Sequence, residues 1–213
     1  RPTPADAPVI ATTCLDSSMI AFPAVIGATI EGHAACPVLG QADQDGSGMT
    51  TSEAKPARPA ARIEDHALLG DGLTAALVTS DGTLAWLCWP RFDSPACFAA
   101  LLGNADNGHW SLGPTEPVIE RSRRYVEDTL VLETDHRTAG GKIRVTDFMV
   151  PGDGPSSVVR RVTGLEGQVP IRMDLDLRFD HGRIRPWIEP RDDGFIATAG
   201  PHRAVLRAST RWR

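Results

Sequence analysis

LTAALVTSDGTLAWLCWPRFDSPACFAALLG, residues 73–103, carries the strongest structural signal in this chain. Two apolar runs flank the dipeptide Asp81-Gly82, which favours a tight turn between two antiparallel strands. The second run, Thr83 to Pro90, is apolar at both sets of alternating positions, a pattern typical of a strand that is buried on both faces. We therefore expect a β-hairpin whose second strand lies inside a sheet.

A charged loop and a short helix are expected directly after this hairpin. The loop is Pro90-Arg91-Phe92-Asp93, which places one cation and one anion at the end of a buried strand. Its last residue or Ser94 can cap a helix, Pro95 suits the first turn, and Gly103 can end it. We therefore expect one short helix near residues 95–102.

Short strands are expected throughout the chain after residue 62. The clearest alternation of apolar and polar residues is at 171–179, IRMDLDLRF, which predicts a strand with one buried face. Turn signals separate the other strand candidates, which are 109–112, 118–126, 129–135, 142–150, 157–163, 187–189, 195–199 and 203–208. This spacing is typical of an antiparallel β-sandwich, so the predicted fold class is mainly β.

Residues 1–61 read differently from the rest of the chain. They lack a sustained period of 2 or 3.6, and Pro23 and Gly27 interrupt their apolar run at 18–30. A secretory signal peptide is the alternative for this run, but no basic segment adjoins it and the acidic Asp16 precedes it. We expect a disordered or spurious leader here.

Met49 is the candidate true start of the protein, because it opens a polar, Pro- and Ala-rich segment of the kind that leads into a domain. One sandwich domain is then expected over residues 62–213. The chain begins with Arg1 and stops at Arg213 directly after an expected strand. We therefore expect a fragment of a longer protein.

Composition disfavours some classes of partner. The net charge is −5 and no cluster of Lys and Arg stands out, which disfavours nucleic acid and anionic membranes as partners. No apolar run approaches the roughly 20 residues of a membrane span. The four cysteines, Cys14, Cys36, Cys88 and Cys97, form no CxxC pair, so we expect free thiols in the reducing cytoplasm and no metal site.

Three aspartates are candidates for chemistry. Asp174 and Asp176 lie on one face of a strand, about 7 Å apart, and paired carboxylates are the groups that glycosidases use. Arg172 and Arg178 flank them on the same face, so an ion-pair ladder is the preferred interpretation. Asp147 falls on the apolar face of its strand, which predicts either a bulge or a carboxylate held inside by hydrogen bonds.

Other polar residues point to no catalytic constellation. The histidines at 33, 66, 109, 136, 181 and 202 have no metal-ligand spacing, and we expect them to pack or to lie at the surface. Ser94 is not in a nucleophile elbow, and Gly70-Asp71-Gly72 matches no phosphate loop. Trp89 lies beside the charged loop, where it either packs in the core or stacks on a sugar ring. We predict no catalytic residue, no cofactor and no metal.

A series of segments resembles the N-terminal region of bacterial glucoamylase- and trehalase-like proteins of glycoside hydrolase family 15. The most specific is WLCWPRFDSP at 86–95, preceded by IEDHALLGD at 63–71 and TAALV at 74–78. The later segments are RRY at 123–125, TLVLET at 129–134, VTDFM at 145–149, GLEG at 164–167, LRFD at 177–180 and PW at 186–187. The resemblance covers about residues 62–208, and His181 departs from it because an aromatic residue is expected there.

The resemblance implies an antiparallel sandwich of the supersandwich type, placed before an (α/α)6-barrel catalytic domain. The family hydrolyses α-glucosidic bonds with inversion, using one glutamic acid and one glutamate base that both lie in the barrel. No catalytic residue can be carried over to this chain, because Glu133 and Glu166 match sandwich positions. The implied partners are the barrel domain and an α-glucoside or trehalose substrate.

In such a protein the loop from Trp89 to Asp93 would be close to the substrate. Arg91 would donate hydrogen bonds to sugar hydroxyls, and Asp93 would orient Arg91. The structural alternative is an internal salt bridge between Arg91 and Asp93 that pins the hairpin to the helix. The expected function is therefore the N-terminal domain of a cytoplasmic glycoside hydrolase, with a stand-alone carbohydrate-binding or interaction module as the alternative.

Overall fold

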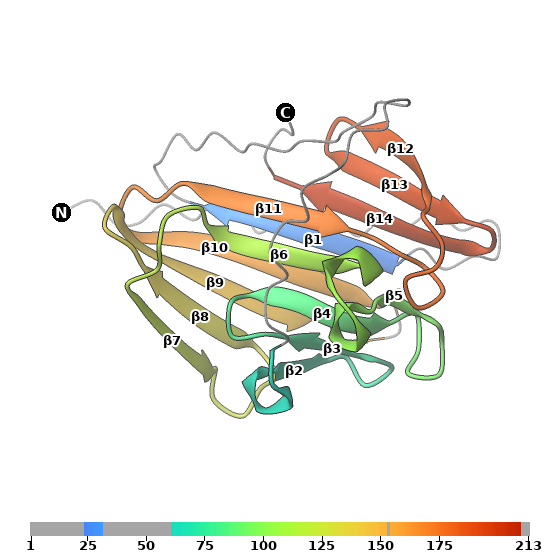
Figure 1. Cartoon of the computed structure of the whole chain (residues 1–213), viewed down its shortest axis with the longest axis horizontal. Helices are drawn as coiled ribbons and strands as arrows, with labels where there is room; N and C mark the ends of the chain where they lie inside the picture. The colour runs from blue at the N-terminus through green and yellow to red at the C-terminus, as the bar shows by residue number, and fades with distance from the viewer. Residues whose placement is uncertain (1–23, 32–60, 153, 210–213) are drawn as a thin grey trace.

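The computed structural model describes residues 24–31, 61–152 and 154–209 of the chain. The described residues form two β-sheets that stack face to face (Figure 1). In order across the larger sheet, the strands are β12 (Trp187–Arg191), β13 (Gly194–Ala199), β14 (His202–Ala208), β1 (Ala24–Glu31), β10 (Ser157–Gly167), β9 (Gly141–Met149), β8 (Leu132–Arg137) and β7 (Glu120–Tyr125). The predicted β-sandwich is confirmed.

The smaller sheet contains the hairpin and its neighbours. Its order is β11 (Ile171–Asp176), β6 (His109–Pro114), β4 (Thr83–Cys88), β3 (Ala75–Val78) and β2 (Ala67–Gly70), and β5 (Ala96–Phe98) pairs with β4 off this path. Three single-turn 3-10 helices, η1 (Ile63–Asp65), η2 (Ala100–Leu102) and η3 (Ala105–Asn107), are the helical elements among the described residues. The sandwich is therefore built almost entirely from strands.

The hairpin at Asp81-Gly82 is confirmed. Strands β3 and β4 pair in antiparallel register. Gly82 has a φ of 86°, a backbone conformation that residues other than glycine rarely adopt. The turn is closed by a hydrogen bond of 2.8 Å from Thr79 N to Thr83 O. Along β4, Leu84, Ala85, Leu87 and Cys88 are buried, so both faces of this strand are covered, as expected.

The short helix expected near residues 95–102 is absent, which corrects the sequence prediction. Residues 96–98 form β5, and one 3-10 turn follows at 100–102. All three residues of β5 are buried, so pairing with β4 satisfies their backbone while it buries Cys97 and Phe98. The hydroxyl of Ser94 caps no helix, because it accepts a hydrogen bond of 3.2 Å from Arg91 N inside the loop.

Strand β1 is the second departure from expectation. Residues 24–31 fall inside the segment expected to be a disordered or spurious leader, yet they form a strand between β10 and β14. The stretch AVIGATIE is rich in β-branched and small residues, which suits a strand with a neighbour on each side. The rest of the expected leader before residue 61, Met49 included, lies outside the described residues.

The core lies between the two sheets. Trp110 of β6 and Leu84 of β4 belong to the smaller sheet, and Leu132, Val158 and Leu206 belong to the larger one. All five are essentially fully buried, and they form one contiguous apolar cluster. The alternation predicted for 171–179 is found in part, since β11 ends at Asp176 and a turn follows at 180–183.

Candidate functional site

Trp89 lies in the core, at the end of the hairpin strand. Its side chain is 5% exposed and belongs to the main apolar cluster. The indole Nε1 is buried and has no hydrogen-bond partner among the described residues. The peptide bond from Trp89 to Pro90 is cis, and the chain leaves the core at this point. The aromatic ring is thus covered in this structure, while the loop that follows it is exposed.

Arg91 and Asp93 meet at the surface. Arg91 Nε lies 3.2 Å from Asp93 Oδ1, and the two side chains are 66% and 79% exposed. This is the ion pair of the structural alternative, but it joins residues of one loop and pins no helix. An exposed pair of this kind contributes at most about 1 kcal/mol to stability, so the guanidinium and the carboxylate remain available to a polar ligand.

A neighbouring turn supports this loop from the side. Phe92 N donates a hydrogen bond of 3.2 Å to Leu73 O. Asp71 holds the turn, because its Oδ1 accepts hydrogen bonds of 2.9 Å from both Leu73 N and Thr74 N. Its Oδ2 accepts a further bond from the buried Ser156 hydroxyl. Sequence reasoning treated Asp71 as part of a glycine-rich turn and missed this anchoring role.

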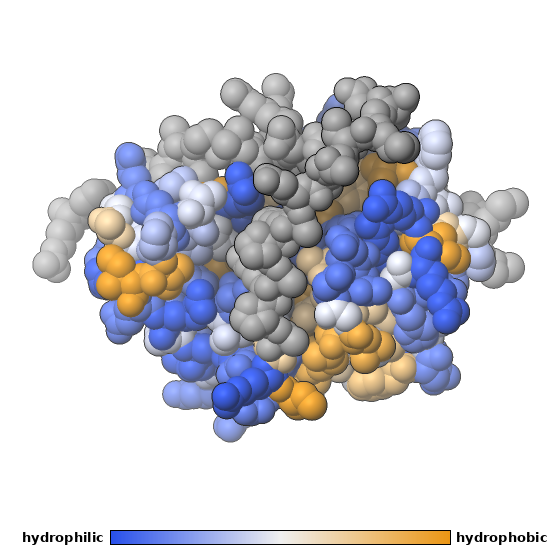
Figure 2. All heavy atoms as spheres, in the orientation of Figure 1, coloured by the Kyte–Doolittle hydropathy of each residue, from blue (hydrophilic) through white to orange (hydrophobic). Residues whose placement is uncertain are grey.

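Exposed apolar side chains lie in the loop and on the turn beside it. Phe92 and Leu73, which the backbone hydrogen bond brings together, are both exposed, and so is Leu102 of η2. Figure 2 shows apolar surface gathered over the region of β3, β4 and β5. The charged pair of Arg91 and Asp93 therefore lies in a partly apolar surface, a combination found where proteins contact other proteins or sugars.

Asp147 has the structural role that its inward position predicted. It is fully buried on β9 and faces Arg160 of β10, with Arg160 Nε 2.9 Å from Asp147 Oδ1 and Nη2 3.2 Å from Oδ2. Arg160 also donates to Trp110 O at 2.6 Å and to Gly82 O at 2.5 Å. The carboxylate is thus held inside by hydrogen bonds rather than displaced by a bulge.

Sequence reasoning missed Arg160. It occupies an inward position of its strand, between the buried Val158 and Val162, and that alternation is the signal that could have found it. Its guanidinium lies 5.1 Å from the centroid of the Trp110 ring. Arg160 joins the two sheets, since it takes its partners from β9, from β6 and from the hairpin turn.

The aspartates of β11 are paired, as the ion-pair interpretation expected. Asp176 Oδ2 lies 2.6 Å from Nη2 of Arg178, which is itself buried, and burial raises the pKa of Asp176. Asp174 has a different partner from the one expected, because its Oδ2 lies 3.4 Å from His109 Nε2 on β6. Both aspartates lie on one face of the sheet and each already has a partner, which disfavours glycosidase chemistry at this pair.

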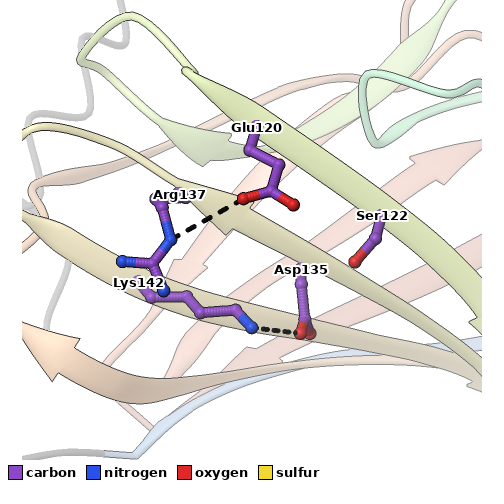
Figure 3. Close-up of a pocket in the computed structure, with 5 residues that line it drawn as sticks. All are labelled: Glu120, Ser122, Asp135, Arg137 and Lys142. Atoms are coloured by element: carbon purple, nitrogen blue, oxygen red, sulfur yellow. Dashed lines mark ion pairs between the residues drawn. The ribbon is translucent and has the colours of Figure 1, made fainter.

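A shallow polar hollow lies on the outer strands β7 to β9 (Figure 3). Lys142 Nζ lies 2.9 Å from Asp135 Oδ2, and Arg137 Nε lies 3.8 Å from Glu120 Oε2. Hydrogen bonds from Arg144 and, to a lesser extent, from Lys142 lower the pKa of Asp135 to about 2. Asp135 is therefore ionised at neutral pH and cannot act there as a general acid.

The glutamates set aside at the sequence level also belong to ion pairs of this surface. Glu133 of β8 lies 2.5 Å from Arg124 and 3.3 Å from Arg144. Glu166 of β10 lies 3.1 Å from Arg137. Both are on sandwich strands, as expected, and neither faces a second unpaired carboxylate.

Three of the described histidines pack against another ring or in the core, whereas His109 pairs with Asp174 and the His66 ring lies 2.8 Å from Arg62 O. His181 lies near Trp86, with ring centroids 6.2 Å apart, and His202 stacks on Phe179 at 5.8 Å. His136 is fully buried, and burial lowers its pKa to about 4. Arg121 is the next contributor to that shift, and its Nε lies 3.4 Å from His136 Nδ1. In the described ranges no group of three or more His, Cys, Asp or Glu side chains is placed to hold a metal ion.

Two further observations concern the cysteines and membrane-spanning helices. Cys88 and Cys97 are free and buried, and burial raises the pKa of the Cys97 thiol; Cys14 and Cys36 lie outside the described residues. Within the ranges that the structure covers, no helix has the length and apolar character needed to cross a membrane.

Comparison with known proteins identifies the domain. Residues 56–212 match the family described as trehalase-like, N-terminal. The chain belongs to this family. The matched range contains every strand of the sandwich except β1. No solved structure matches the chain.

Curated relatives of this trehalase-like domain are named trehalases. Trehalase 1 of Sulfolobus acidocaldarius is 35% identical over 126 residues, which cover 59% of this chain and 21% of the relative. The trehalase of Mycobacterium tuberculosis is 32% identical over 156 residues, covering 64% of this chain and 23% of the relative. The trehalase of Mycolicibacterium smegmatis is 33% identical over 141 residues, covering 57% of this chain and 21% of the relative. The chain thus spans between a fifth and a quarter of the length of these relatives.

Proposed function

We propose that residues 62–213 are the N-terminal sandwich domain of a cytoplasmic enzyme that hydrolyses the α-glucosidic bond of trehalose or of an α-glucan. The observation that carries this proposal is the family match over residues 56–212, together with relatives that are named trehalases. The series of segments that resembles glycoside hydrolase family 15 runs over the same range. The free, buried Cys88 and Cys97 support a reducing compartment.

The chemistry is proposed to lie in another domain of the enzyme. Each carboxylate described above is already engaged, by arginine, lysine or histidine or, for Asp71, by backbone N–H groups and the Ser156 hydroxyl, so none of these is set up as the acid or the base of a hydrolase. An inverting hydrolase needs two carboxyl groups about 6.5–9.5 Å apart, with room for a water molecule between them. We place that pair in an (α/α)6 barrel that follows the sandwich.

The sandwich itself would cover the barrel and present the loop that follows Trp89. The apolar surface at Leu73 and Phe92 suits contact with a second domain. The exposed pair of Arg91 and Asp93 suits hydrogen bonding to sugar hydroxyls, because a guanidinium donates and a carboxylate accepts. Trp89 would support the loop from inside rather than stack on the sugar, since its ring is buried.

The test is the Arg91→Ala substitution in the longest natural protein that contains this domain. The expected result is a roughly tenfold fall in kcat/KM for trehalose or maltose, equivalent to about 1.4 kcal/mol of lost transition-state stabilisation, with an unchanged Tm. Arg62→Ala is the matched control, because Arg62 and Glu64 form another exposed pair two residues apart, 79% and 70% exposed.

Two outcomes would contradict the proposal in different ways. A lower Tm with unchanged kinetics would assign Arg91 a structural role only. A full-length protein that hydrolyses neither trehalose nor maltose, while it binds one of them by calorimetry, would favour the stand-alone carbohydrate-binding module.

A further inference from the structure

Strand β1 has an unusual place in the larger sheet. It lies between β10 and β14 and runs parallel to both, with partners from Val25↔Ser157 to Glu31↔Thr163 on one side and from Ala24↔Ala204 to Ala28↔Ala208 on the other. Every other ladder among the described strands is antiparallel. Figure 1 shows β1 lying within the sheet rather than at its edge.

The strand comes from outside the domain that it completes. Residues 24–31 precede the range 56–212 that matches the family, and residues 32–62 separate β1 from the first following described element, η1. Without β1, the facing edges of β10 and β14 would each present a row of unpaired backbone N–H and C=O groups. Such a pair of edges is a ready receptor for one extended segment, because backbone hydrogen bonds on both sides hold it.

The neighbours of β1 define which sequence fits the groove. Ile26 is in register with the buried Val158 and Leu206, and Ile30 is in register with the buried Val162. Ala28 is in register with Arg160, whose guanidinium is already engaged by Asp147 and by two carbonyl oxygens. The groove therefore accepts an extended strand with apolar residues at alternate positions and a small uncharged residue beside Arg160.

We propose that the groove between β10 and β14 is a strand-binding site, and that the Ala24–Glu31 segment of a second copy of this chain can replace the chain's own segment. Nothing in the register distinguishes the two sources, because both supply the same residues. The covalent link favours pairing within one chain, as linked partners meet at a high effective concentration. Exchange is then expected when the chain's own strand cannot pair, or when two copies fold together at high concentration.

The first test blocks the strand in the full chain. Ile26→Pro/Ala28→Pro removes two backbone donors and is incompatible with a central strand. The probe is a synthetic peptide of residues 22–33, FPAVIGATIEGH, with an N-terminal fluorophore, and binding is followed by anisotropy. We expect the variant to bind the peptide with 1:1 stoichiometry and at least 100-fold more tightly than the unchanged chain does. The same peptide with Ala28→Lys should not bind.

The matched control carries two prolines outside residues 24–31. Ser52→Pro/Ala54→Pro should behave as the unchanged chain does, because its β1 remains able to pair. A folded Ile26→Pro/Ala28→Pro variant that ignores the peptide would overturn the proposal, and so would equal binding of the Ala28→Lys peptide, since the groove would then read no sequence.

A second experiment decides the case if the proline variant fails to fold. Two differently tagged chains are made, and both carry Cys14→Ser and Cys36→Ser. One of them also carries Glu31→Cys and the other carries Thr163→Cys, at positions that pair directly in the register. They are unfolded together, refolded at high concentration and treated with a mild oxidant. A disulfide between the two chains is expected. Its absence, or an equal yield when Ser111→Cys on β6 replaces Thr163→Cys, would overturn the proposal. The inference does not depend on the proposed function.

Discussion

Two arginine–aspartate pairs in this domain have the same chemistry and opposite surroundings. Arg91 and Asp93 lie two residues apart in a loop and are mostly exposed. Arg160 and Asp147 come from adjacent strands, are completely buried, and share further hydrogen bonds with Trp110 O and Gly82 O. Water screens the first pair, whereas nothing but the protein solvates the second.

The comparison shows that burial decides what an ion pair does. The exposed pair can be broken at little cost to the fold, so its groups are free to contact a ligand. The buried pair cannot lose one partner without leaving a charge in the core. The predictions that follow test this difference, and they run from the largest expected effect to the smallest.

Arg160→Ala should be the most damaging of these changes. It leaves the Asp147 carboxylate buried without its partner and frees two carbonyl oxygens in the core, so we expect a loss of about 3–5 kcal/mol in the free energy of unfolding. Urea denaturation followed by tryptophan fluorescence measures it. The double change Arg160→Met/Asp147→Leu should recover most of the loss, and a double variant as unstable as the single one would show that the pair itself was stabilising.

His136 is a second buried group, and its effect on stability depends on pH. Its pKa is lowered from 6.5 to about 4, mainly by burial and next by Arg121, with a smaller lowering by Arg160, while Asp135 and Asp81 partly offset the shift. Between these two pH values the unfolded chain binds a proton that the folded chain excludes, so stability falls as the pH falls. Acidification from pH 7 to pH 4 should cost about 3 kcal/mol from this group.

The measurement for His136 is urea unfolding at a series of pH values. His136→Gln is the control, because it keeps a polar side chain that does not titrate, and its stability should change less across the same window. An identical pH dependence in both proteins would assign the effect to other groups.

Substitution of Asp71 should cost more stability than breaking the exposed ion pair and less than breaking the buried one. It is half-buried, and it accepts hydrogen bonds from Leu73 N, Thr74 N and the Ser156 hydroxyl. Asp71→Ala leaves the buried hydroxyl without its acceptor, so we expect a loss of about 1–3 kcal/mol. Thermal unfolding checks the loss, and Ser156→Ala should be milder because it removes only one of the three bonds.

Arg91→Ala should have the smallest effect on the fold. Loss of a mostly exposed pair is expected to change the free energy of unfolding by less than about 1 kcal/mol. Urea denaturation beside Arg160→Ala gives the direct comparison. A loss as large as that of Arg160→Ala would mean that the loop is part of the core, and it would remove the argument that Arg91 is available to a substrate.

Some elements could be predicted because their signals are local. The hairpin at Asp81-Gly82 follows from one turn dipeptide and two apolar runs, and the strands follow from alternation with a period of two. The inward position of Asp147 also followed from alternation. The same alternation marks Arg160 as inward, but a buried cation is improbable without its partners, and those come from β9, from β6 and from the hairpin turn.

Other elements depended on partners far away in the sequence. The segment at 95–102 carries helix signals, but β4 lies beside it and residues 96–98 pair as β5. Strand β1 has no pattern that distinguishes it from an interrupted apolar run, and its neighbours β10 and β14 lie more than a hundred residues further along the chain. The sequence allows either a core or a surface position for Trp89, and the structure places it in the core.

The sequence by itself determined the fold class, the hairpin and the family resemblance, because these rest on turn chemistry, alternation and short motifs that act within a few residues. Only the tertiary structure decided which arginine meets Asp147, which edge accepts residues 24–31, and how the two arginine–aspartate pairs differ. The physical reason is that burial and backbone pairing are properties of the assembled sheets. An arginine–aspartate pair is a replaceable surface contact at Arg91 and Asp93, whereas the core requires the pair of Arg160 and Asp147.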